Sequence, residues 1–157
     1  MTYTTDNPII NRPLEAFQKF DTDTQLALLW YGYLDIKNEL NPAPPDAVES
    51  LGQALVDHVK ALPREEQLQA QRDVVNGTDN QVSRGYGALS SSVKLEFWLL
   101  LAQCMEEGSV ITVPNDYQLP ENTSEFVDQI KQLDLEQRIT FTRSAVSQMG
   151  YHVGANA

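Results

Sequence analysis

Few of the residues that carry out chemistry in proteins stand here at a spacing that would let them act together. His58 and His152 each lack neighbours at the spacing of metal ligands. Cys104 is the only cysteine, which excludes an internal disulfide and fits a reducing compartment. The sequence contains no glycine-rich phosphate loop and no Gly-x-Ser-x-Gly nucleophile motif. We therefore predict neither a metal site nor an enzyme.

The acidic pairs, such as Glu65–Glu66 and Glu106–Glu107, are expected to be solvated surface charge. The net charge of −11 predicts a surface that repels nucleic acid and anionic lipid. The longest apolar run, residues 97–104, is too short to span a bilayer. The first residues lack the apolar segment of a secretory signal. We therefore expect a cytoplasmic protein with no membrane insertion and no nucleic acid partner.

Aromatic side chains are the other group that could have a function, because they exceed what a small helical core needs. They include Trp30, Tyr33, Tyr86, Phe97, Trp98 and Tyr117. Two interpretations stay open on composition alone. The rings could simply fill the core, or they could line a tunnel in which flat rings stack against a planar conjugated ligand.

Two apolar segments on helical spacing must position the tryptophans. In residues 25–35 an i, i+3, i+4, i+7, i+8 stripe predicts one buried helix face, made of Leu26, Leu29, Trp30, Tyr33 and Leu34. Residues 94–108 repeat the pattern and leave almost no polar side. A helix that is apolar nearly all round must be covered by protein or ligand on every face.

The rest of the chain predicts an all-α fold in one domain, as expected for 157 residues. Residues 1–12 are expected to form an N-terminal arm, because Pro8 and Pro13 disfavour helix there, and residues 13–157 the helical domain. A short helix is predicted to begin at Pro13. A longer one is predicted to run from a cap at Asp21 or Thr22 to about Leu40.

Caps and breakers divide the remaining chain into further helices. A proline-rich breaker over 41–46 precedes a predicted helix over 46–62, and Pro63 is expected to begin the next. The turn at 77–80 ends that helix, and Gly108 ends the second tryptophan helix. A loop is predicted from Gly108 to Asn122. The other predicted helices are 82–89, 123–133 and 135–150.

A weak internal repeat relates two helix pairs. Lys60 and Arg72 have the same separation as Lys131 and Arg143, and Leu68 and Val75 match Ile139 and Val146 in the same way. The period is too long for a solenoid. It suggests two helical lobes about an approximate twofold axis, with chance similarity between amphipathic helices as the alternative.

Several blocks in order resemble the helical N-terminal domain of the orange carotenoid protein and the free-standing helical carotenoid proteins of cyanobacteria. They are QLALLWYGYLD, QAQRDVVN, SRGYGALSSSVKLEFW, MEEGSVITVPNDYQL and QRITFTRSAVSQMG, within residues 17–150. The resemblance implies two interleaved four-helix bundles with an apolar channel between them. It also implies a bound keto-carotenoid of the canthaxanthin, echinenone or 3'-hydroxyechinenone type.

Carried over position by position, the resemblance implies a set of carotenoid-binding residues. Those matching Tyr33 and Trp98 pack against one end ring of the pigment in the family. The full set is Leu26, Leu29, Trp30, Tyr33, Leu95, Trp98, Val113, Tyr117, Val146 and Met149. The chain departs from the family pattern at Leu99, where a second aromatic is common, and at Arg72, where a cysteine is common. Arg72 would make one pocket wall more polar or close it to pigment.

The implied function is photoprotection by quenching singlet oxygen, which is the hypothesis we favour. The alternatives are an excitation quencher that docks on the phycobilisome, a carotenoid carrier, or a helical interaction adaptor whose aromatics are only core. Docking would need a local basic patch, for which the candidates are Arg84, Arg138 and Arg143. For Arg143, snorkelling to water beside a groove or pairing with a carboxylate is the role we favour over partner contact.

The same resemblance bears on partners and location. A separate protein like the family's C-terminal domain is a candidate carotenoid donor. A monomer is expected with pigment and self-association without it, because a bare apolar groove favours association. The expected location is the cytoplasm near thylakoid membranes.

Overall fold

Helices form all the regular structure in the part of the chain that the computed structural model describes, residues 7–39, 50–114 and 117–151. This confirms the predicted all-α class. The finer assignment to two interleaved four-helix bundles stays a prediction. The elements are α1 (Pro8–Lys19), α2 (Thr22–Ile36), α3 (Ser50–Lys60), α4 (Arg64–Asn76), α5 (Gln81–Gly87), α6 (Ser91–Glu107), the 3-10 turn η2 (Glu121–Thr123), α7 (Ser124–Lys131) and α8 (Leu135–Ser147).

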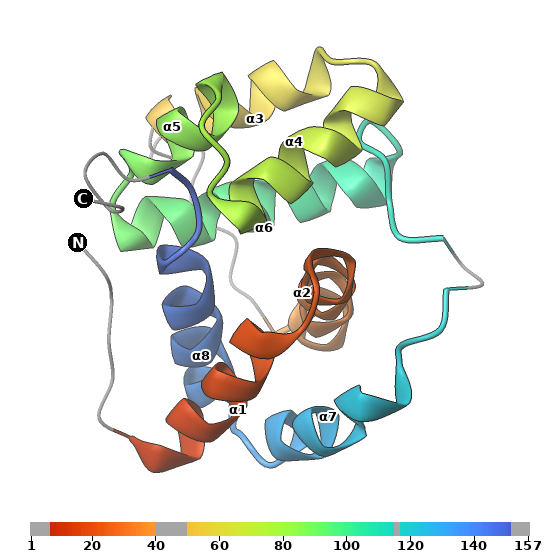
Figure 1. The fold of residues 1–157 in the computed structure, drawn as a ribbon, viewed down its shortest axis with the longest axis vertical. Helices are drawn as coiled ribbons and strands as arrows, with labels where there is room; N and C mark the ends of the chain where they lie inside the picture. The colour runs from red at the N-terminus through yellow and green to blue at the C-terminus, as the bar shows by residue number, and fades with distance from the viewer. Residues whose placement is uncertain (1–6, 40–49, 115–116, 152–157) are drawn as a thin grey trace.

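The helix α6 crosses the middle of the molecule and packs against both α3 and α8 (Figure 1). In that view α3, α4 and α5 lie with α6 in the upper half, whereas α1, α7 and α8 lie together below. The helix α2 lies between these groups and packs against α4 and α6. The two tryptophan helices, α2 and α6, therefore both lie at the centre of the fold.

The predicted start of the first helix at Pro13 is wrong, because α1 begins at Pro8. The Asn7 side chain accepts a hydrogen bond from the Ile9 backbone N–H at 3.0 Å and caps the helix. Pro8 follows as the first helical residue, where its missing N–H costs nothing. Pro13 lies inside the helix, where Ile10, Pro13 and Phe17 are buried. Burial of this face against α7 and α8 offsets the cost of the backbone hydrogen bond that Pro13 cannot donate.

Several other helix ends follow local chemistry as predicted. Asp21 accepts a hydrogen bond from the Thr24 N–H at 2.8 Å, and Ser90 accepts one from the Val93 N–H at 3.3 Å. Gly77 and Gly108 end α4 and α6 with φ of 67° and 88°, a left-handed conformation that favours glycine.

Other predicted helix ends differ from those observed. Pro63 precedes α4 as its N-cap and does not begin it, and α8 ends at Ser147, before residue 150. The predicted end of the second helix at about Leu40 is wrong, because α2 ends at Ile36 and residues 37–39 form a turn. The predicted breaker over 41–46 lies outside the described residues.

The two helix pairs behind the predicted repeat have matching secondary structure. Lys60 ends α3 and Lys131 ends α7, and in each pair a short connection leads to a helix of 13 residues. Arg72 and Arg143 occupy equivalent positions in α4 and α8. The twofold relation between two lobes stays a prediction.

Candidate ligand-binding cavities

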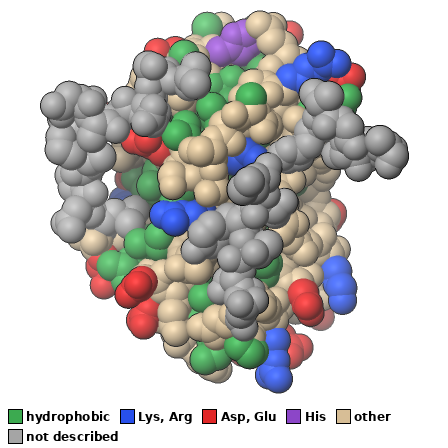
Figure 2. Space-filling model, turned by 90° about the vertical axis from the view of Figure 1, so that its left-hand side faces the viewer, with side chains coloured by type: hydrophobic (Ala, Val, Ile, Leu, Met, Phe, Trp, Pro, Cys, Tyr) green, Lys and Arg blue, Asp and Glu red, His purple; other side chains and the backbone are tan. Residues whose placement is uncertain are grey.

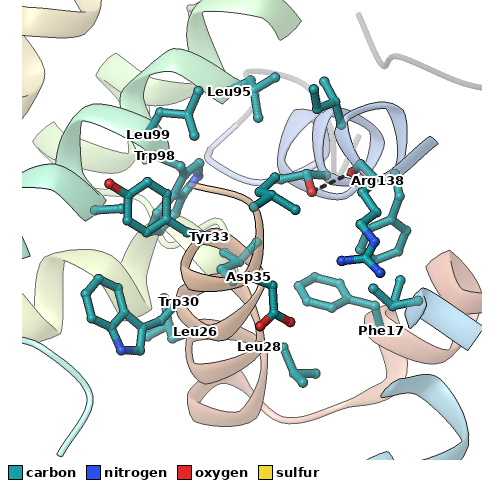
Figure 3. A pocket seen from close by; sticks show the side chains of 18 of the residues that line it. Phe17, Leu26, Leu28, Trp30, Tyr33, Asp35, Leu95, Trp98, Leu99 and Arg138 are labelled. Carbon is teal, nitrogen blue, oxygen red and sulfur yellow. Dashed lines mark hydrogen bonds between the residues drawn. The ribbon is translucent and has the colours of Figure 1, made fainter. Parts of the chain in front are cut away.

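A largely apolar cavity of about 160 Å³, called cavity 1 here, lies between α2, α6, α8 and the ends of α1 and α7. The lining side chains labelled in Figure 3 come from α1, α2, α6 and α8. Six of the predicted carotenoid-binding residues line it, namely Leu26, Leu29, Trp30, Tyr33, Leu95 and Trp98. Leu99, where the family often has an aromatic residue, lines it as well.

The helix α2 supplies one wall of cavity 1. Its N-terminus is stabilised by Asp21, and the hydrogen bonds from Thr24 lower the pKa of that carboxyl. Leu26 is buried, whereas Trp30 and Tyr33 are half-buried. The rings of Trp30 and Tyr33 stack with centroids 6.0 Å apart and an interplanar angle of 24°. This wall therefore presents flat aromatic surface to the cavity.

Tyr33 is held in place by a group on α6. Its hydroxyl donates to Glu106 Oε1 at 2.5 Å, and Lys37 Nζ donates to Glu106 Oε2 at 2.7 Å. Burial and the neighbouring carboxylate raise the pKa of Tyr33, because both disfavour the phenolate. Glu106 was expected to be simple solvated charge. It instead joins α2 to α6 beside the aromatic wall, and its side chain is only 33% exposed.

The opposite wall carries Trp98, which is joined to the protein core. Its indole Nε1 donates to Tyr86 Oη at 3.0 Å, and the Tyr86 hydroxyl donates to the Val146 carbonyl at 2.5 Å. Burial raises the pKa of Tyr86. The Trp98 ring also meets Phe97 edge-on, with centroids 5.3 Å apart. This relay links α5, α6 and α8 behind the cavity.

Two predicted carotenoid-binding residues belong to this region of the core. Val146 and Met149 are 0% and 4% exposed, and neither lines cavity 1 or the second cavity described below. The backbone carbonyl of Val146 is the acceptor for Tyr86. Their assignment to the pigment stays a prediction.

Sequence reasoning missed the aromatic end of cavity 1. Phe17, Phe126 and Phe141 line it there. Phe17 meets Phe126 and Phe141 at centroid distances of 6.0 and 5.9 Å. Each phenylalanine lies on the apolar face of a different helix, so no local pattern joins them. Only the packing of α1 against α7 and α8 brings them together.

Lys94 is a second residue that the sequence reasoning missed. It is 1% exposed, its Nζ donates to the Ser147 carbonyl at 2.8 Å, and it lies 5.5 Å from the Tyr86 ring centroid. Burial lowers its pKa, because desolvation disfavours the charged form. A lysine on the same helical face as Phe97 and Leu101 is a signal that could have indicated it.

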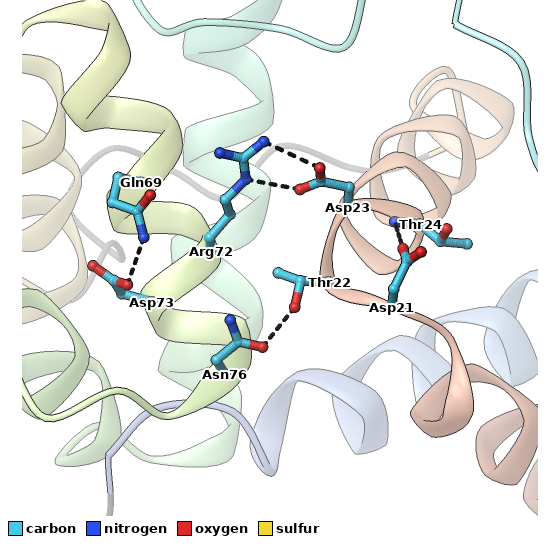
Figure 4. A network of polar contacts seen from close by, with 8 residues as sticks. All are labelled: Asp21, Thr22, Asp23, Thr24, Gln69, Arg72, Asp73 and Asn76. Atoms are coloured by element: carbon cyan, nitrogen blue, oxygen red, sulfur yellow. Dashed lines mark hydrogen bonds and ion pairs between the residues drawn. The ribbon is translucent and has the colours of Figure 1, made fainter.

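A second cavity, called cavity 2, encloses about 260 Å³ and is lined by the remaining predicted residues Val113 and Tyr117. Leu26, Gln71 and Met105 line both cavities and so mark the junction between them. Cavity 2 has a polar side, where the Arg72 guanidinium donates twice to Asp23 at 2.8 and 3.1 Å. Figure 4 shows this pair joining α4 to the start of α2. Arg72 thus makes one wall more polar.

The three arginines considered for partner contact lie on different parts of the fold. Arg84 is exposed on α5, pairs with Asp79 and lies 5.1 Å from the Tyr151 ring centroid beyond the end of α8. Arg138, near the start of α8, donates to the Leu133 carbonyl at 3.1 Å and lines cavity 1. Arg143 is half-buried further along α8. The structure therefore places Arg84 and Arg138 towards opposite ends of α8.

The surface carries no large basic cluster on the face in Figure 2, where Lys and Arg side chains are scattered among acidic and apolar ones. Over the described ranges, no group of three or more His, Cys, Asp and Glu residues is arranged to hold a metal ion. Within those ranges, too, no helix combines the length and apolar character needed to cross a membrane.

A model of the family described as "Orange carotenoid protein, N-terminal" matches residues 3–152. The chain belongs to this family. It is 38% identical over 138 residues to an orange carotenoid-binding domain-containing protein of Nostoc sp., covering 87% of this chain and 81% of that protein. It is 33% identical over 147 residues to the orange carotenoid-binding protein of Synechocystis sp., covering 93% of this chain but 46% of that longer protein.

Solved structures of the family have the same fold. The red carotenoid protein of Anabaena (Nostoc) sp. binding canthaxanthin matches with a TM-score of 0.80 at 39% identity, covering 92% of this chain and 100% of that one. The orange carotenoid protein of the same organism, also binding canthaxanthin, matches with a TM-score of 0.85 at 32% identity. That match covers 92% of this chain and 47% of the neighbour.

Proposed function

We propose that this chain binds a keto-carotenoid of the canthaxanthin type and protects by quenching singlet oxygen. The observation that carries the proposal is a pair of cavities that share lining residues. Cavity 1 has aromatic walls from α2 and α6, and cavity 2 continues between α2, α4, residues 111–114 and Tyr117. Family membership and two neighbours solved with canthaxanthin support the choice of ligand.

The cavity residues suit a long apolar rod. Stacked rings at Trp30 and Tyr33 offer a flat surface, and Trp98 offers another from α6. The end walls of cavity 1 carry Phe17 and Phe126. A rod that reaches from cavity 1 into cavity 2 would pass Leu26 and the long, flexible side chains of Gln71 and Met105 at the junction. We propose the ten residues named from the resemblance, together with these phenylalanines, as the set to test.

The carotenoid, when bound, would supply the chemistry by accepting excitation and releasing it as heat. The protein's own contribution is to exclude water and to hold the end rings in one orientation. Tyr33 is suited to this task because Glu106 fixes its hydroxyl, and Trp98 because the Tyr86 relay fixes its indole. No bond in the ligand is made or broken, so we propose a non-enzymatic role.

The test is to produce the full chain in a carotenoid-forming host and record its visible absorption spectrum and monomer content. We expect a coloured monomer that lowers the singlet-oxygen phosphorescence lifetime more than the apo protein does. A colourless, stable monomer would contradict the proposal and favour the helical adaptor. The apo protein is expected to self-associate through its open cavities.

Docking on the phycobilisome is the second candidate, and the exposed guanidinium of Arg84 is the feature that favours it. We also propose that the protein is cytoplasmic and lies near thylakoid membranes. Its single helical domain would take pigment from a partner that resembles the family's C-terminal domain, or would pass pigment on as a carrier. Antenna fluorescence with added holo-protein separates docking from singlet-oxygen quenching, because an unchanged yield removes the docking role.

A further inference from the structure

One buried side chain in the cavity lining has a polar atom that the protein does not satisfy. Gln71 is 5% exposed, and its Nε2 has no hydrogen-bond partner among the described residues. It lines both cavities, together with Leu26 and Met105. A buried amide N–H without an acceptor is costly, so proteins rarely keep one without a reason.

The contrast with Gln67, one turn earlier on the same face of α4, shows that the position is unusual. Gln67 is equally buried, at 3% exposed. Its Nε2 donates to the carbonyls of Lys60 and Ser109 at 3.3 and 3.2 Å, and its Oε1 accepts from the Ile111 N–H at 2.9 Å. The amide of Gln67, which packs against other parts of the chain, therefore has hydrogen-bond partners for both its N–H groups and its oxygen. The Nε2 of Gln71, which meets the cavities, has none.

The neighbouring side chains leave the Gln71 amide without an acceptor in this structure. Arg72 can only donate, and the Asp23 carboxylate, which also lines cavity 2, accepts two hydrogen bonds from Arg72. The side chains of Leu26 and Met105 offer no strong acceptor. A molecule at the junction that carries an oxygen acceptor would satisfy the Gln71 amide.

We propose that Gln71 determines specificity for an oxygenated carotenoid, by donating a hydrogen bond from Nε2 to the carbonyl oxygen of a keto end ring placed at the junction. This inference rests on the proposed function and adds a selective contact to it. A hydrocarbon carotenoid at the junction would offer no acceptor and would leave the amide unpaired. A keto-carotenoid satisfies the donor and keeps the apolar contacts, because it differs only at the ring oxygen.

The test is competitive reconstitution of the full-length apo protein with equimolar canthaxanthin and β-carotene. We expect the wild type to favour canthaxanthin by about fivefold to a hundredfold, the range that corresponds to leaving a buried donor unsatisfied. Gln71→Met keeps the length of the side chain without its donor and should lose most of the preference, because β-carotene uptake rises. The matched control is Gln69→Met, which changes an exposed residue of the same helix.

Two further readouts do not depend on pigment preference. The C=O stretch of bound canthaxanthin should lie at a lower wavenumber in the wild type than in Gln71→Met, because the hydrogen bond weakens that bond. The apo form of Gln71→Met should melt at a higher temperature than the wild-type apo form, because the unsatisfied amide is gone. Because Gln69 donates a hydrogen bond to Asp73, its variant can melt lower for that reason alone. A rise in the apo melting temperature of Gln69→Met, or a shift of its bound C=O stretch, would count against the assignment to Gln71.

The outcomes separate the inference from the function beneath it. Equal uptake of the two pigments by the wild type, or an unchanged preference in Gln71→Met, would overturn the role of Gln71 while leaving carotenoid binding intact. A wild-type protein that takes up neither pigment would overturn the proposed function and this inference with it.

Discussion

The two tryptophans occupy matching places in two similar sequence segments but have different environments. Trp98 is 9% exposed, donates its indole N–H to Tyr86 and meets two aromatic rings edge-on. Trp30 is half-buried and stacks on Tyr33, a residue of its own helix. Trp98 therefore joins α6 to the core, whereas Trp30 mainly forms cavity wall.

This difference shows what helical periodicity can and cannot indicate. An apolar stripe identifies a face that must be covered, but it does not say whether protein or ligand covers it. The face that carries Trp98 is covered partly by the protein core behind the cavity. At Trp30 the ring faces the cavity, so a ligand would complete its burial.

The largest expected effect is that of Trp98→Ala on stability. We expect a loss of about 3–5 kcal/mol in the free energy of unfolding, because a buried indole is removed and Tyr86 loses its donor. Urea denaturation of the apo protein, followed by circular dichroism at 222 nm, measures it. A loss of only about 1–2 kcal/mol, as expected for Trp30→Ala, would show that Trp98 is mainly cavity wall as Trp30 is.

Tyr86→Phe sharpens the comparison by removing only the relay. The ring remains, but Trp98 Nε1 and the Val146 carbonyl lose their partner in a buried site. We expect a loss of about 1–3 kcal/mol in the free energy of unfolding. The control is Tyr31→Phe, whose half-buried hydroxyl makes a longer contact of 3.4 Å to the Tyr117 carbonyl and should matter less. Equal losses in the two variants would contradict the relay.

Trp30→Ala tests the other member of the pair. We expect a loss of only about 1–2 kcal/mol in the apo protein, because the ring is half-buried there. Pigment retention should fall about tenfold or more, because the stacking surface is lost. Retention is measured as the ratio of visible to 280 nm absorbance after gel filtration, corrected for the removed tryptophan. Full colour in Trp30→Ala would remove this residue from the proposed binding set.

The smallest effect concerns the group that holds Tyr33. Hydrogen bonds from Lys37 and then Tyr33 lower the pKa of Glu106 from its ordinary value of 4.5. A carboxyl with a lowered folded-state pKa stabilises the fold above its unfolded pKa, and this contribution is lost as the pH falls through the folded value. Glu106→Gln should therefore melt below the wild type at pH 7, and the difference should shrink below about pH 4.5.

The matched control for that experiment is Glu107→Gln, which changes the exposed neighbouring acid. Its melting temperature should follow that of the wild type at each pH, within the small range of surface substitutions. A difference between Glu106→Gln and the wild type that stays constant from pH 7 to pH 3 would show that ionisation of Glu106 is not its source.

Much of the secondary structure could be predicted because it depends on neighbours in sequence. Asp21 and Ser90 cap their helices, and Gly77 and Gly108 end theirs, through contacts within four residues. The start of α1 could not be predicted in this way. There the prolines argued against helix, and burial of Ile10 and Phe17 in the tertiary structure outweighed them.

The candidate site could likewise be predicted only in part. Six predicted residues do meet at cavity 1, and Val113 and Tyr117 meet at cavity 2, because the matching blocks carry over their helices. Gln71 was not proposed as a binding residue, because an amide on a helix is ordinary until its surroundings are known.

From the sequence alone follow the helical class, most helix ends, the absence of recognisable catalytic motifs and the two apolar segments at the centre of the fold. These depend on side-chain type and local hydrogen bonds, which act over one or two helical turns. Only the tertiary structure decided that Trp98 is anchored, that Lys94 is buried and that the Gln71 amide lacks an acceptor. Burial and satisfaction of a polar group depend on which distant helices pack around it, and no local pattern encodes that packing.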